Sequence, residues 1–422
     1  MMQPKFIFEA SGTLGDQLPL LALAEGLRAL GHPCHVLGTT AAVDIAARRG
    51  VPFTAVVPAN ANNLASVEEN FSRHVFPSYR PAFEFFEAEV NRGSPLVVVN
   101  LSGASASTLM AERHGLPLCR LLLSPFEWGH HAQPSAHQSQ PTHPYILGRV
   151  NRFRAALGRP ALQHMAELDA LITHRLGLFP EWFGATVATF CGGADLVGFP
   201  LPPPEGALPD PLCRWLERHG PPLVFTPGTG VRDVAELFGA AEACCRELGR
   251  PGVLLSPHAE KRPFDMTRAV AHFDYLDLGL LLPRSCLIVH HGGIGTTARA
   301  LAAGVPQIIS PQIFDQPDNA RRVEHLGVGV ELPRGDLCGE ALAVCARRLL
   351  GSASVQLATA RAARLIRRGD GASTAVASLV RRFVTTPRPG RGSLHQWIQP
   401  GRFALSLFEH CAALLSARAR GA

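Results

Sequence analysis

The sequence predicts an α/β fold with a parallel sheet in each half of the chain. Short apolar runs alternate with stretches whose apolar residues recur at helical spacing, and glycine closes most of those stretches. A proline-rich connector at residues 198–211 interrupts this alternation, which then starts afresh. Each half opens with a strand, a glycine turn and a helix, which indicates two Rossmann-like domains facing one another across a cleft. A chain of 422 residues also fits two domains of about 200 residues better than one core.

The first half, residues 1–204, contains five apolar runs that we interpret as buried strands. These are residues 5–10, 35–38, 52–57, 96–100 and 118–123. Helical spacing predicts helices at residues 18–30, 41–49, 71–86, 105–114 and 147–176. Residues 125–144 are poor in charge and rich in His, Gln, Pro and Ser, and we expect this long loop to shape a substrate cleft.

The second half, residues 205–384, repeats the pattern. Strands are expected at residues 223–226, 252–256, 287–289 and 305–310, with helices at residues 234–248, after the turn at 292–297, and within 341–383. The tail, residues 385–422, begins as a Pro/Gly/Arg linker and ends in an apolar, helix-compatible piece. Packing on the first half, peripheral membrane contact and homodimer formation are all compatible with that tail.

Composition narrows the classes of function. An apolar content of 46% argues against disorder. The formal charge of +6 comes from scattered arginines, which favours a solvated basic surface over nucleic-acid binding and is compatible with a nucleotide diphosphate as ligand. The ten cysteines include no C-x-x-C pair, so we expect reduced thiols and no structural zinc. Because the sequence shows neither a signal peptide nor a membrane-spanning apolar run, we predict a cytoplasmic protein.

The first glycine turn contains Gly12, Thr13 and Gly15 and leads to Asp16. A carboxylate at or near the N-cap of a helix commonly caps that helix. At the mouth of a cleft, the same carboxylate can accept a proton from a substrate hydroxyl, with the turn meeting the acceptor or a phosphate. The turn departs from G-x-G-x-x-G, and no acidic residue ends the second strand, which argues against a nicotinamide dinucleotide.

A second glycine turn follows the strand at residues 287–289. His290 and His291 end that strand, Gly293 and Gly295 form the turn, and Thr296 leads into an alanine-rich helix. Free backbone N–H groups and the helix dipole favour an anion at such a position. Imidazole, amide and hydroxyl groups together suit a diphosphate, and we expect no metal here.

A polar loop after the next strand contains Asp315, Gln316 and Asn319. An adjacent Asp and Gln offer the acceptors and donors that grip vicinal sugar hydroxyls. Helix capping is the alternative interpretation, above all for Asp318. The strand, turn, helix, strand and polar loop form a β-α-β unit with its chemistry at the carboxyl ends of the strands, which indicates a nucleotide site.

These motifs resemble a known family. HHGGIGTT, AAGVPQIISP and DQPDNA, in that order and spacing, are similar to the donor site of GT-B glycosyltransferases of family 1. That group includes the bacterial natural-product glycosyltransferases and the rhamnosyltransferases of rhamnolipid synthesis. The opening GTLGDQLPLLALAEGLRALGH, the block PPLVFTPGTG and the segment YLDLGLLLPRSCLIVHHGG also resemble that group, so the likeness spans most of residues 5–384.

The resemblance implies a nucleoside-diphosphate sugar, with UDP or dTDP as nucleotide, held mainly by the second domain. His291, Gly295 and Thr296 would contact the diphosphate, together with the neighbouring His290 and Gly293. Gly228 and Thr229 would meet the phosphate or the sugar from another turn. The acceptor would lie in the first domain, and the connector would act as the hinge that closes the cleft.

The resemblance also assigns roles at three other places. Tyr275 matches the position whose ring stacks on the base, Asp315 and Gln316 match the pair that holds the donor sugar, and Asp16 matches the base of bacterial members. Two positions depart from the pattern of plant members. Arg299 replaces a glutamate on the ribose, and residues 277–278 (Asp-Leu) replace a Pro-Gln pair of the base-binding segment, which leaves uracil and thymine both open.

We therefore expect an inverting glycosyl transfer in one displacement, without metal or cofactor. Asp16 would deprotonate the acceptor hydroxyl directly or through a histidine, and hydrogen bonds would stabilise the leaving diphosphate. The apolar residues 18–23 and 71–86 suit a small apolar or lipid-like natural-product acceptor, and they suit a core equally well. The alternatives are a nucleotide-sugar epimerase of the same fold and a non-catalytic nucleotide-binding partner protein.

Overall fold

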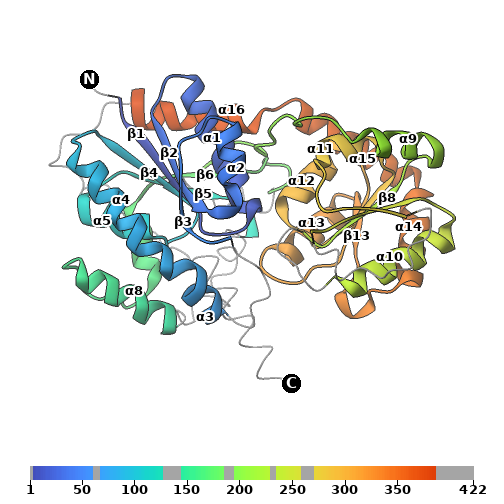
Figure 1. Ribbon diagram of the computed structural model, residues 1–422, viewed down its shortest axis with the longest axis horizontal. Helices are drawn as coiled ribbons and strands as arrows, with labels where there is room; N and C mark the ends of the chain where they lie inside the picture. The colour runs from blue at the N-terminus through green and yellow to red at the C-terminus, as the bar shows by residue number, and fades with distance from the viewer. Residues whose placement is uncertain are drawn as a thin grey trace. The chain divides into compact units, whose positions relative to one another are not determined.

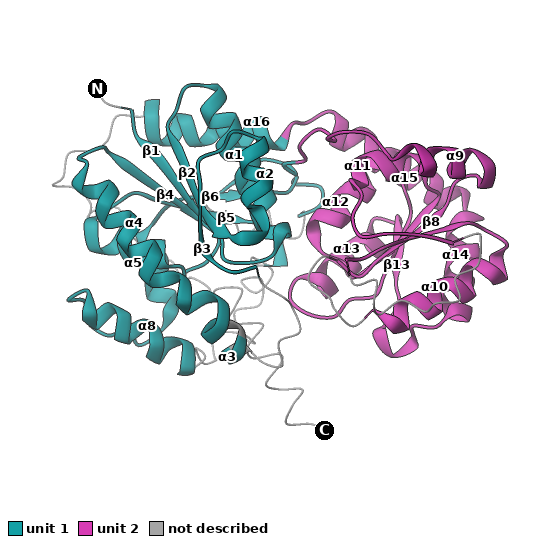
Figure 2. Cartoon of the chain, viewed as in Figure 1, with its two compact units in different colours: residues 1–60, 64–200, 371–422 teal, residues 61–63, 201–370 magenta. Residues whose placement is uncertain are grey.

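The computed structural model describes residues 3–59, 67–126, 144–184, 194–228, 234–257 and 270–385. The chain divides into two compact units (Figure 2). Unit 1 comprises residues 1–60, 64–200 and 371–422, and unit 2 comprises residues 61–63 and 201–370. Thr229, most of the predicted loop at 125–144 and the tail from residue 386 lie outside the described residues, so the predictions made for them stay predictions.

Unit 1 is built on a parallel sheet with the strand order β3-β2-β1-β4-β5-β6-β7 (Figure 1). The strands are β1 (Lys5–Glu9), β2 (Cys34–Thr39), β3 (Phe53–Val57), β4 (Leu96–Asn100), β5 (Leu118–Leu122), β6 (Ile172–Gly177) and β7 (Ala194–Leu196). The five predicted strands are confirmed. Residues 172–177, expected to end a helix, form β6 instead, because the β-branched pair at its start favours an extended chain and β5 offers a partner.

Helices cover both faces of this sheet. One face packs against α1 (Leu14–Ala29), α2 (Val43–Arg48) and α16 (Gly371–Val380). The other face packs against α4 (Tyr79–Asn91), α5 (Ala106–His114) and α8 (Pro144–Ala156), and α4 follows α3 (Val67–Asn70) and a π-helical turn (Phe71–Val75). With both faces covered, β4 is buried along its whole length. Residues 371–385, nearly all of which we placed in the second domain, pack on unit 1.

Unit 2 has a parallel sheet with the strand order β10-β9-β8-β11-β12-β13. The strands are β8 (Leu223–Thr226), β9 (Gly252–Leu255), β10 (Val270–Phe273), β11 (Leu287–His290), β12 (Gln307–Ile309) and β13 (Gly329–Glu331). The helices are α9 (Asp210–His219), α10 (Ala235–Leu248), α11 (Leu278–Leu281), α12 (Ile294–Ala303), α13 (Gln316–His325), α14 (Gly339–Leu350) and α15 (Ala353–Arg367). The four predicted strands are confirmed. β10 and β13 went unpredicted because neither is a continuous apolar run: β10 contains His272, and β13 has a single apolar side chain, Val330.

Glycine ends the helices where the sequence predicts it. Gly115, Gly249 and Gly304 follow α5, α10 and α12 with φ values of 62°, 59° and 72°. This left-handed conformation costs glycine little and stops a helix sharply. Each stop returns the chain to the amino end of the next strand, so that the carboxyl ends of the parallel strands meet at one edge of each sheet. In the described part of the chain, no helix is both long and apolar enough to cross a membrane.

Candidate functional site

The predicted donor residues of unit 2 follow the carboxyl ends of neighbouring strands. Thr226 at the end of β8 pairs with His290 at the end of β11, and His290 pairs in turn with Ile309 at the end of β12. Gly228, His291 and the loop before α13 therefore start from the same edge of the sheet. In a parallel α/β sheet this edge is where ligands bind.

The His291 imidazole lies between two glycines. A Cβ atom added at Gly228 would lie 2.5 Å from Cε1 of His291, and one added at Gly293 would lie 2.5 Å from its Nε2. Burial lowers the pKa of His291 to about 4, so the ring is neutral near pH 7. Its Nδ1 is buried and finds no hydrogen-bond partner among the described residues. A neutral imidazole in this slot is suited to donate one hydrogen bond to a phosphate oxygen.

His290 plays a different part from the one predicted. Its ring is buried, its Nε2 lies 2.9 Å from Oε1 of Gln307, and the Gly292 N–H donates to its Nδ1 at 3.1 Å. Because Nδ1 accepts, the proton sits on Nε2 and is donated to Gln307. Burial lowers the pKa of His290 to about 3, which keeps this tautomer neutral. The ring has no nitrogen left for a diphosphate, so the predicted contact between His290 and the sugar nucleotide is wrong. His290 instead orients the backbone N–H of Gly292.

The start of α12 is open. The first amides of a helix have no partner within it. In α12 the N-cap is Gly293, which has no side chain to cap these amides, and the first turn contains no acidic residue. Gly295 is exposed, and a Cβ atom there would meet no described atom within 4 Å. Of the two threonines here, Thr297 is buried and its hydroxyl donates back to the Gly293 carbonyl at 3.1 Å. The half-buried Thr296 is therefore the one whose hydroxyl is suited to a ligand. Within the described ranges, no group of three His, Cys, Asp or Glu is placed to hold a metal ion.

Asp315 and Gln316 lie where α13 begins. Asp315 is the N-cap residue, and its Oδ2 accepts a hydrogen bond from Nδ2 of Asn319 at 2.9 Å. The Gln316 side chain holds the loop before it: its Oε1 accepts from the N–H groups of Gln312 and Ile313 at 2.8 and 3.1 Å. The side-chain oxygen of Gln316 therefore holds the loop backbone. Its side-chain NH₂ group is the part that is suited to donate to a sugar hydroxyl.

The backbone directly before this pair is strained. Phe314 has a φ of 59°, the one positive value at a non-glycine residue in the described part of the chain. For a bulky side chain this conformation costs about 1–3 kcal/mol and persists only where the surroundings impose it. Here the strain directs the loop into the first turn of α13, where Asp315 lies.

Tyr275 follows β10, which is the edge strand of the unit 2 sheet, and the residue is 64% exposed. β10 lies three strand positions from β11, which corresponds to about 14 Å at the usual strand spacing. An exposed ring at this remove from the α12 turn suits stacking on a base whose diphosphate lies at the helix start.

The two positions that depart from the plant pattern hold the connector. Nη2 of Arg299 donates to the carbonyl of Pro202 at 2.8 Å. The Asp277 carboxylate accepts from the N–H groups of Gly279 at 2.7 Å and Glu205 at 3.0 Å. Both side chains thus fix residues 202–205 to the face of unit 2 that contains α11 and α12.

Asp16 is the third residue of α1, near the N-cap as predicted. Thr13 is the N-cap, and both its N–H and its hydroxyl donate to Oδ2 of Asp16, at 2.7 and 3.2 Å. These bonds leave Oδ1 for a substrate. Burial raises the pKa of Asp16, and the hydrogen bonds from Thr13 offset part of that rise. A partly exposed carboxylate with a raised pKa is a better base than an ordinary one, so the capping contact is compatible with the predicted base role.

The glycines of this turn differ in purpose. A Cβ atom at Gly12 would lie 2.0 Å from Oδ2 of Asp16, so only glycine leaves room for the carboxylate in its present position. Gly15 is exposed, and a Cβ atom there would have only ordinary contact with the Thr13 hydroxyl, at 3.4 Å.

Gln17 supports the turn and was missed by sequence reasoning. The side chain is fully buried, and its Nε2 donates to the Gly12 carbonyl at 3.1 Å and to the Thr39 hydroxyl at 2.8 Å. Its Oε1 accepts from the Thr39 N–H at 2.9 Å. Gln17 thereby ties the turn to the end of β2, a contact across 22 residues that no local pattern signals.

Glu9 was also missed. It ends β1, is buried, and accepts a hydrogen bond from the Ser107 N–H in the first turn of α5 at 2.7 Å. Burial raises the pKa of Glu9. The carboxylate thus caps a helix start from the central strand of the sheet, and the only sequence signal is an acidic residue inside an apolar run.

The apolar segments considered for the acceptor prove to be core. The fully buried side chains include Leu20, Leu21, Leu23, Phe71, Tyr79 and Phe86. They pack against the two faces of the unit 1 sheet. These side chains therefore stabilise the fold and give no direct sign of the acceptor.

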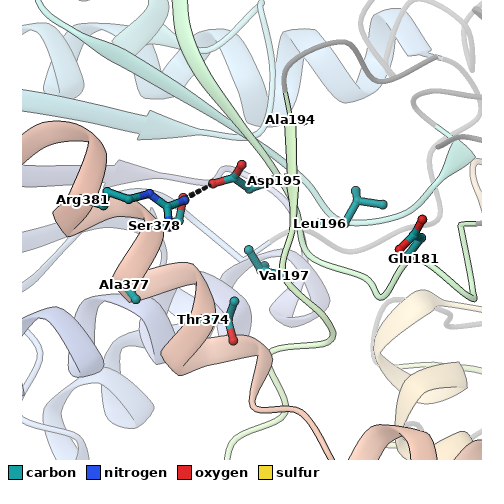
Figure 3. A pocket seen from close by; sticks show the side chains of 9 residues that line it. All are labelled: Glu181, Ala194, Asp195, Leu196, Val197, Thr374, Ala377, Ser378 and Arg381. Carbon is teal, nitrogen blue, oxygen red and sulfur yellow. Dashed lines mark hydrogen bonds and ion pairs between the residues drawn. The ribbon is translucent and has the colours of Figure 1, made fainter. Parts of the chain in front are cut away.

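A hollow of about 520 Å³ in unit 1 contains none of the predicted site residues. It lies beside β7 and α16, and Figure 3 shows Asp195, Ser378 and Arg381 directed at one another. Oδ2 of Asp195 accepts from the Ser378 hydroxyl at 2.5 Å and from Nη2 of Arg381 at 2.7 Å. Because these polar groups bind each other, we interpret them as the attachment of α16 to the sheet edge.

Comparisons with known proteins identify relatives of this chain. Residues 258–376 match the family model described as the C-terminal domain of erythromycin biosynthesis protein CIII-like proteins. The chain is 30% identical to glycosyltransferase GtfC of Amycolatopsis orientalis over 421 aligned positions, covering 89% of this chain and 97% of that protein. It is 27% identical to the vancomycin aglycone glucosyltransferase of the same organism, covering 80% of this chain and 89% of that protein.

Solved structures share the fold. The glycosyltransferase of kitacinnamycin superposes with a TM-score of 0.70 at 18% identity, covering 90% of this chain and 99% of that one. The spinosyn rhamnosyltransferase SpnG, complexed with thymidine diphosphate, superposes with a TM-score of 0.64 at 18% identity, covering 89% of this chain and all of that one. At these identities the likeness shows the fold alone.

Proposed function

The chain belongs to the family-1 glycosyltransferases of the GT-B fold, and from that membership we propose that it moves a sugar from dTDP or UDP to a hydroxyl of a small apolar or lipid-like natural product. The observation that carries the donor assignment is the His291 slot between Gly228 and Gly293, beside the uncapped start of α12. Orphan amides and a neutral imidazole together match a diphosphate. Thymidine diphosphate is the nucleotide favoured, because SpnG binds it in a structure of the same fold.

The proposed reaction is a single displacement that inverts the anomeric carbon. Asp16 takes the proton of the acceptor hydroxyl through Oδ1 while Thr13 holds Oδ2. The bond from the acceptor oxygen to the anomeric carbon forms as the bond from that carbon to the diphosphate oxygen breaks. The negative charge that develops on the leaving diphosphate is stabilised by the amides of α12 and the His291 N–H.

Asp315 and Gln316 are proposed to hold the sugar, and Tyr275 to stack on the base. The Asp315 carboxylate supplies an acceptor for vicinal hydroxyls, and the Gln316 NH₂ supplies a donor. Both residues start from the sheet edge that places His291, so one ligand can meet them together. We propose that these groups act without metal or cofactor and that the enzyme works in the cytoplasm.

The acceptor class rests on the relatives. One of them is named as a glucosyltransferase that acts on vancomycin aglycone. We propose an acceptor of that general kind, a preformed apolar scaffold with a free hydroxyl, without assigning it to named residues of unit 1.

A donor panel tests the proposal. Thermal unfolding is followed with dTDP, UDP, dTDP-glucose, dTDP-rhamnose and UDP-glucose, all at the same concentration. A ligand present at about a hundredfold excess over its dissociation constant stabilises the folded state by about 2.7 kcal/mol, whereas a nucleotide that does not bind leaves the melting temperature unchanged. Mass analysis with a hydroxylated acceptor mixture must then show a glycoside and free nucleotide diphosphate. Sugar isomers formed without acceptor would instead identify an epimerase, and binding without any product would identify a non-catalytic partner.

A further inference from the structure

Asn319 joins the two halves of the candidate donor site. The side chain is fully buried in α13, and its Nδ2 donates to the Gly292 carbonyl and to Oδ2 of Asp315, both at 2.9 Å. One partner belongs to the turn that starts α12, and the other is the residue assigned to the sugar. The two protons of a single NH₂ group thus connect two loops that are distant in sequence.

Gly292 is held through both of its backbone hydrogen-bonding groups. Its N–H donates to Nδ1 of His290, and its carbonyl accepts from Asn319. Its φ is 90°, and a Cβ atom there would lie 2.7 Å from Cγ2 of Ile309 and 3.1 Å from the Gln316 carbonyl oxygen. With glycine alone fitting this position, the turn packs directly on the first residue of α13. Any shift of α13 is therefore transmitted to the α12 turn.

The orientation of the Asn319 amide follows from chemistry. Both neighbours are acceptors, so the NH₂ group must face them and Oδ1 must point the other way. That Oδ1 is buried and has no hydrogen-bond partner within the described residues. A buried carbonyl without a partner costs about 1–3 kcal/mol. An apolar residue would avoid this cost, so the presence of asparagine here points to its two donated bonds.

We propose that Asn319 is a positioning residue that couples the diphosphate turn to the sugar-binding Asp315. By donating to both the Gly292 carbonyl and Oδ2 of Asp315, it sets the carboxylate at one angle and distance from the start of α12. A diphosphate bound at the turn then presents its sugar to a carboxylate that is already in place. This inference rests on the proposed function, because it presupposes that a nucleotide sugar binds here.

A double-mutant cycle on donor binding tests the coupling. Dissociation constants of dTDP, dTDP-glucose and UDP-glucose are measured by calorimetry for the wild type, Asp315→Ala, Asn319→Ala and the double variant. We expect Asp315→Ala to weaken binding of the sugar nucleotide about thirtyfold in the wild type, the loss of hydrogen bonds to a charged group. In the Asn319→Ala background the same change should cost less than about threefold, because the bond from Asn319 that orients the carboxylate is lost. Equal costs in both backgrounds would overturn the proposal.

Two further variants keep the result interpretable. Val323→Ala removes a fully buried side chain one turn further along α13. This variant should have a lower melting temperature, and in it Asp315→Ala should still weaken sugar-nucleotide binding about thirtyfold. If Asp315→Ala no longer weakened binding in this background, any loosening of α13 would have the same effect as losing Asn319, which would contradict the proposal. Asn319→Asp keeps the shape but replaces the NH₂ group by an acceptor facing two acceptors, so it should weaken sugar-nucleotide binding at least as much as Asn319→Ala.

The outcomes separate this inference from the proposed function. A wild type that binds neither dTDP nor any of the sugar nucleotides contradicts the donor assignment itself. A wild type that binds dTDP-glucose or UDP-glucose, with additive costs in the cycle, upholds the donor site and removes Asn319 from it.

Discussion

The two glycine turns of this molecule look alike in sequence and differ in electrostatics. Each follows a central strand of a parallel sheet and leads into a helix, α1 in unit 1 and α12 in unit 2. The start of α1 contains its own carboxylate, because Asp16 accepts the Thr13 N–H. The start of α12 has no acidic residue in its first turn and has the neutral His291 beside it.

This difference teaches how one supersecondary motif serves two chemical purposes. A helix start whose charge is offset by its own side chain attracts an external anion less strongly, and its carboxylate is available for the proposed base role. A helix start left uncapped keeps its orphan amides and its dipole for a ligand. The predictions that follow exchange, remove or titrate the groups that create this difference.

The largest expected effect comes from Asp16→Asn. Asparagine can still accept the hydrogen bond from Thr13 but cannot take a proton, so the transfer rate should fall about a thousandfold, within the usual range for a general base. Steady-state kinetics with the donor found in the panel measures the rate, and calorimetry should show unchanged donor affinity. Because burial is the main cause of the raised pKa of Asp16, losing the charge should not lower the melting temperature. A nearly unaltered rate would rule out Asp16 as the base.

Thr296→Asp gives the α12 turn the carboxylate that the α1 turn already has, at the same position of the helix. The new charge caps the orphan amides and repels a diphosphate, so donor affinity should fall about a hundredfold while the melting temperature holds or rises. Thr296→Asn is the control: it adds a similar shape without charge and should lose far less affinity. Equal losses for both variants would show that shape, not charge, governs this helix start.

Gly12→Ala and Gly295→Ala form a matched pair. A Cβ atom at Gly12 would lie 2.0 Å from Oδ2 of Asp16, so the carboxylate must move and the transfer rate should fall about tenfold. At Gly295 a Cβ atom meets no described protein atom, so alanine should stabilise the helix by up to about 1 kcal/mol; because the methyl group would lie beside the diphosphate, it should weaken donor binding and leave the rate at saturating donor within about threefold of the wild type. The comparison is made by kinetics and thermal unfolding on both variants. A reversed order of effects would contradict the roles assigned to the two turns.

Acid should act on the two turns in opposite senses. The pKa of His290 is lowered from 6.5 to about 3 in the folded protein, so below pH 6.5 the unfolded chain binds the proton more readily. The free energy of unfolding should therefore fall as the pH drops from 6.5 towards 4, by up to about 1.4 kcal/mol per pH unit from this group. The raised pKa of Asp16 contributes with the opposite sign, since the folded state then binds the proton more readily.

Denaturant unfolding at pH 7, 6 and 5 measures this slope. His290→Gln, which retains hydrogen-bonding groups and does not titrate, should flatten it. An identical slope in the variant would mean that His290 is protonated equally well in both states.

Local patterns predicted much of the secondary structure, and they failed where pairing over long distances decides. Apolar runs located β1 to β5, and Gly249 and Gly304 stopped the helices as expected. Residues 172–177 have helical spacing and nonetheless form β6, because β5 supplies a pairing partner that no nearby residue reveals. The strands β10 and β13 were missed because polar residues interrupt them: His272 lies in β10, and Glu331 ends β13.

The candidate site divides in the same way. His291, Asp315 and Asp16 were predicted as site residues from their positions after strands and glycine turns, because that local pattern lies in consecutive residues. Gln17 was missed, because its role is a contact with Thr39 on another strand. His290 was assigned to the donor, and only its bonds to Gln307 and to the Gly292 N–H show that both ring nitrogens are already engaged.

The sequence by itself determined the α/β class, the two glycine turns and the residue types that suit a sugar nucleotide, because these depend on short-range sterics and on hydrogen-bonding groups near one another in the chain. Tertiary structure alone decided that one turn is capped by its own carboxylate and the other is left open. It also decided that Asn319 joins the open turn to Asp315. The physical reason is that burial and hydrogen-bond partners set charge state and orientation, and both arise only when distant strands and helices pack together.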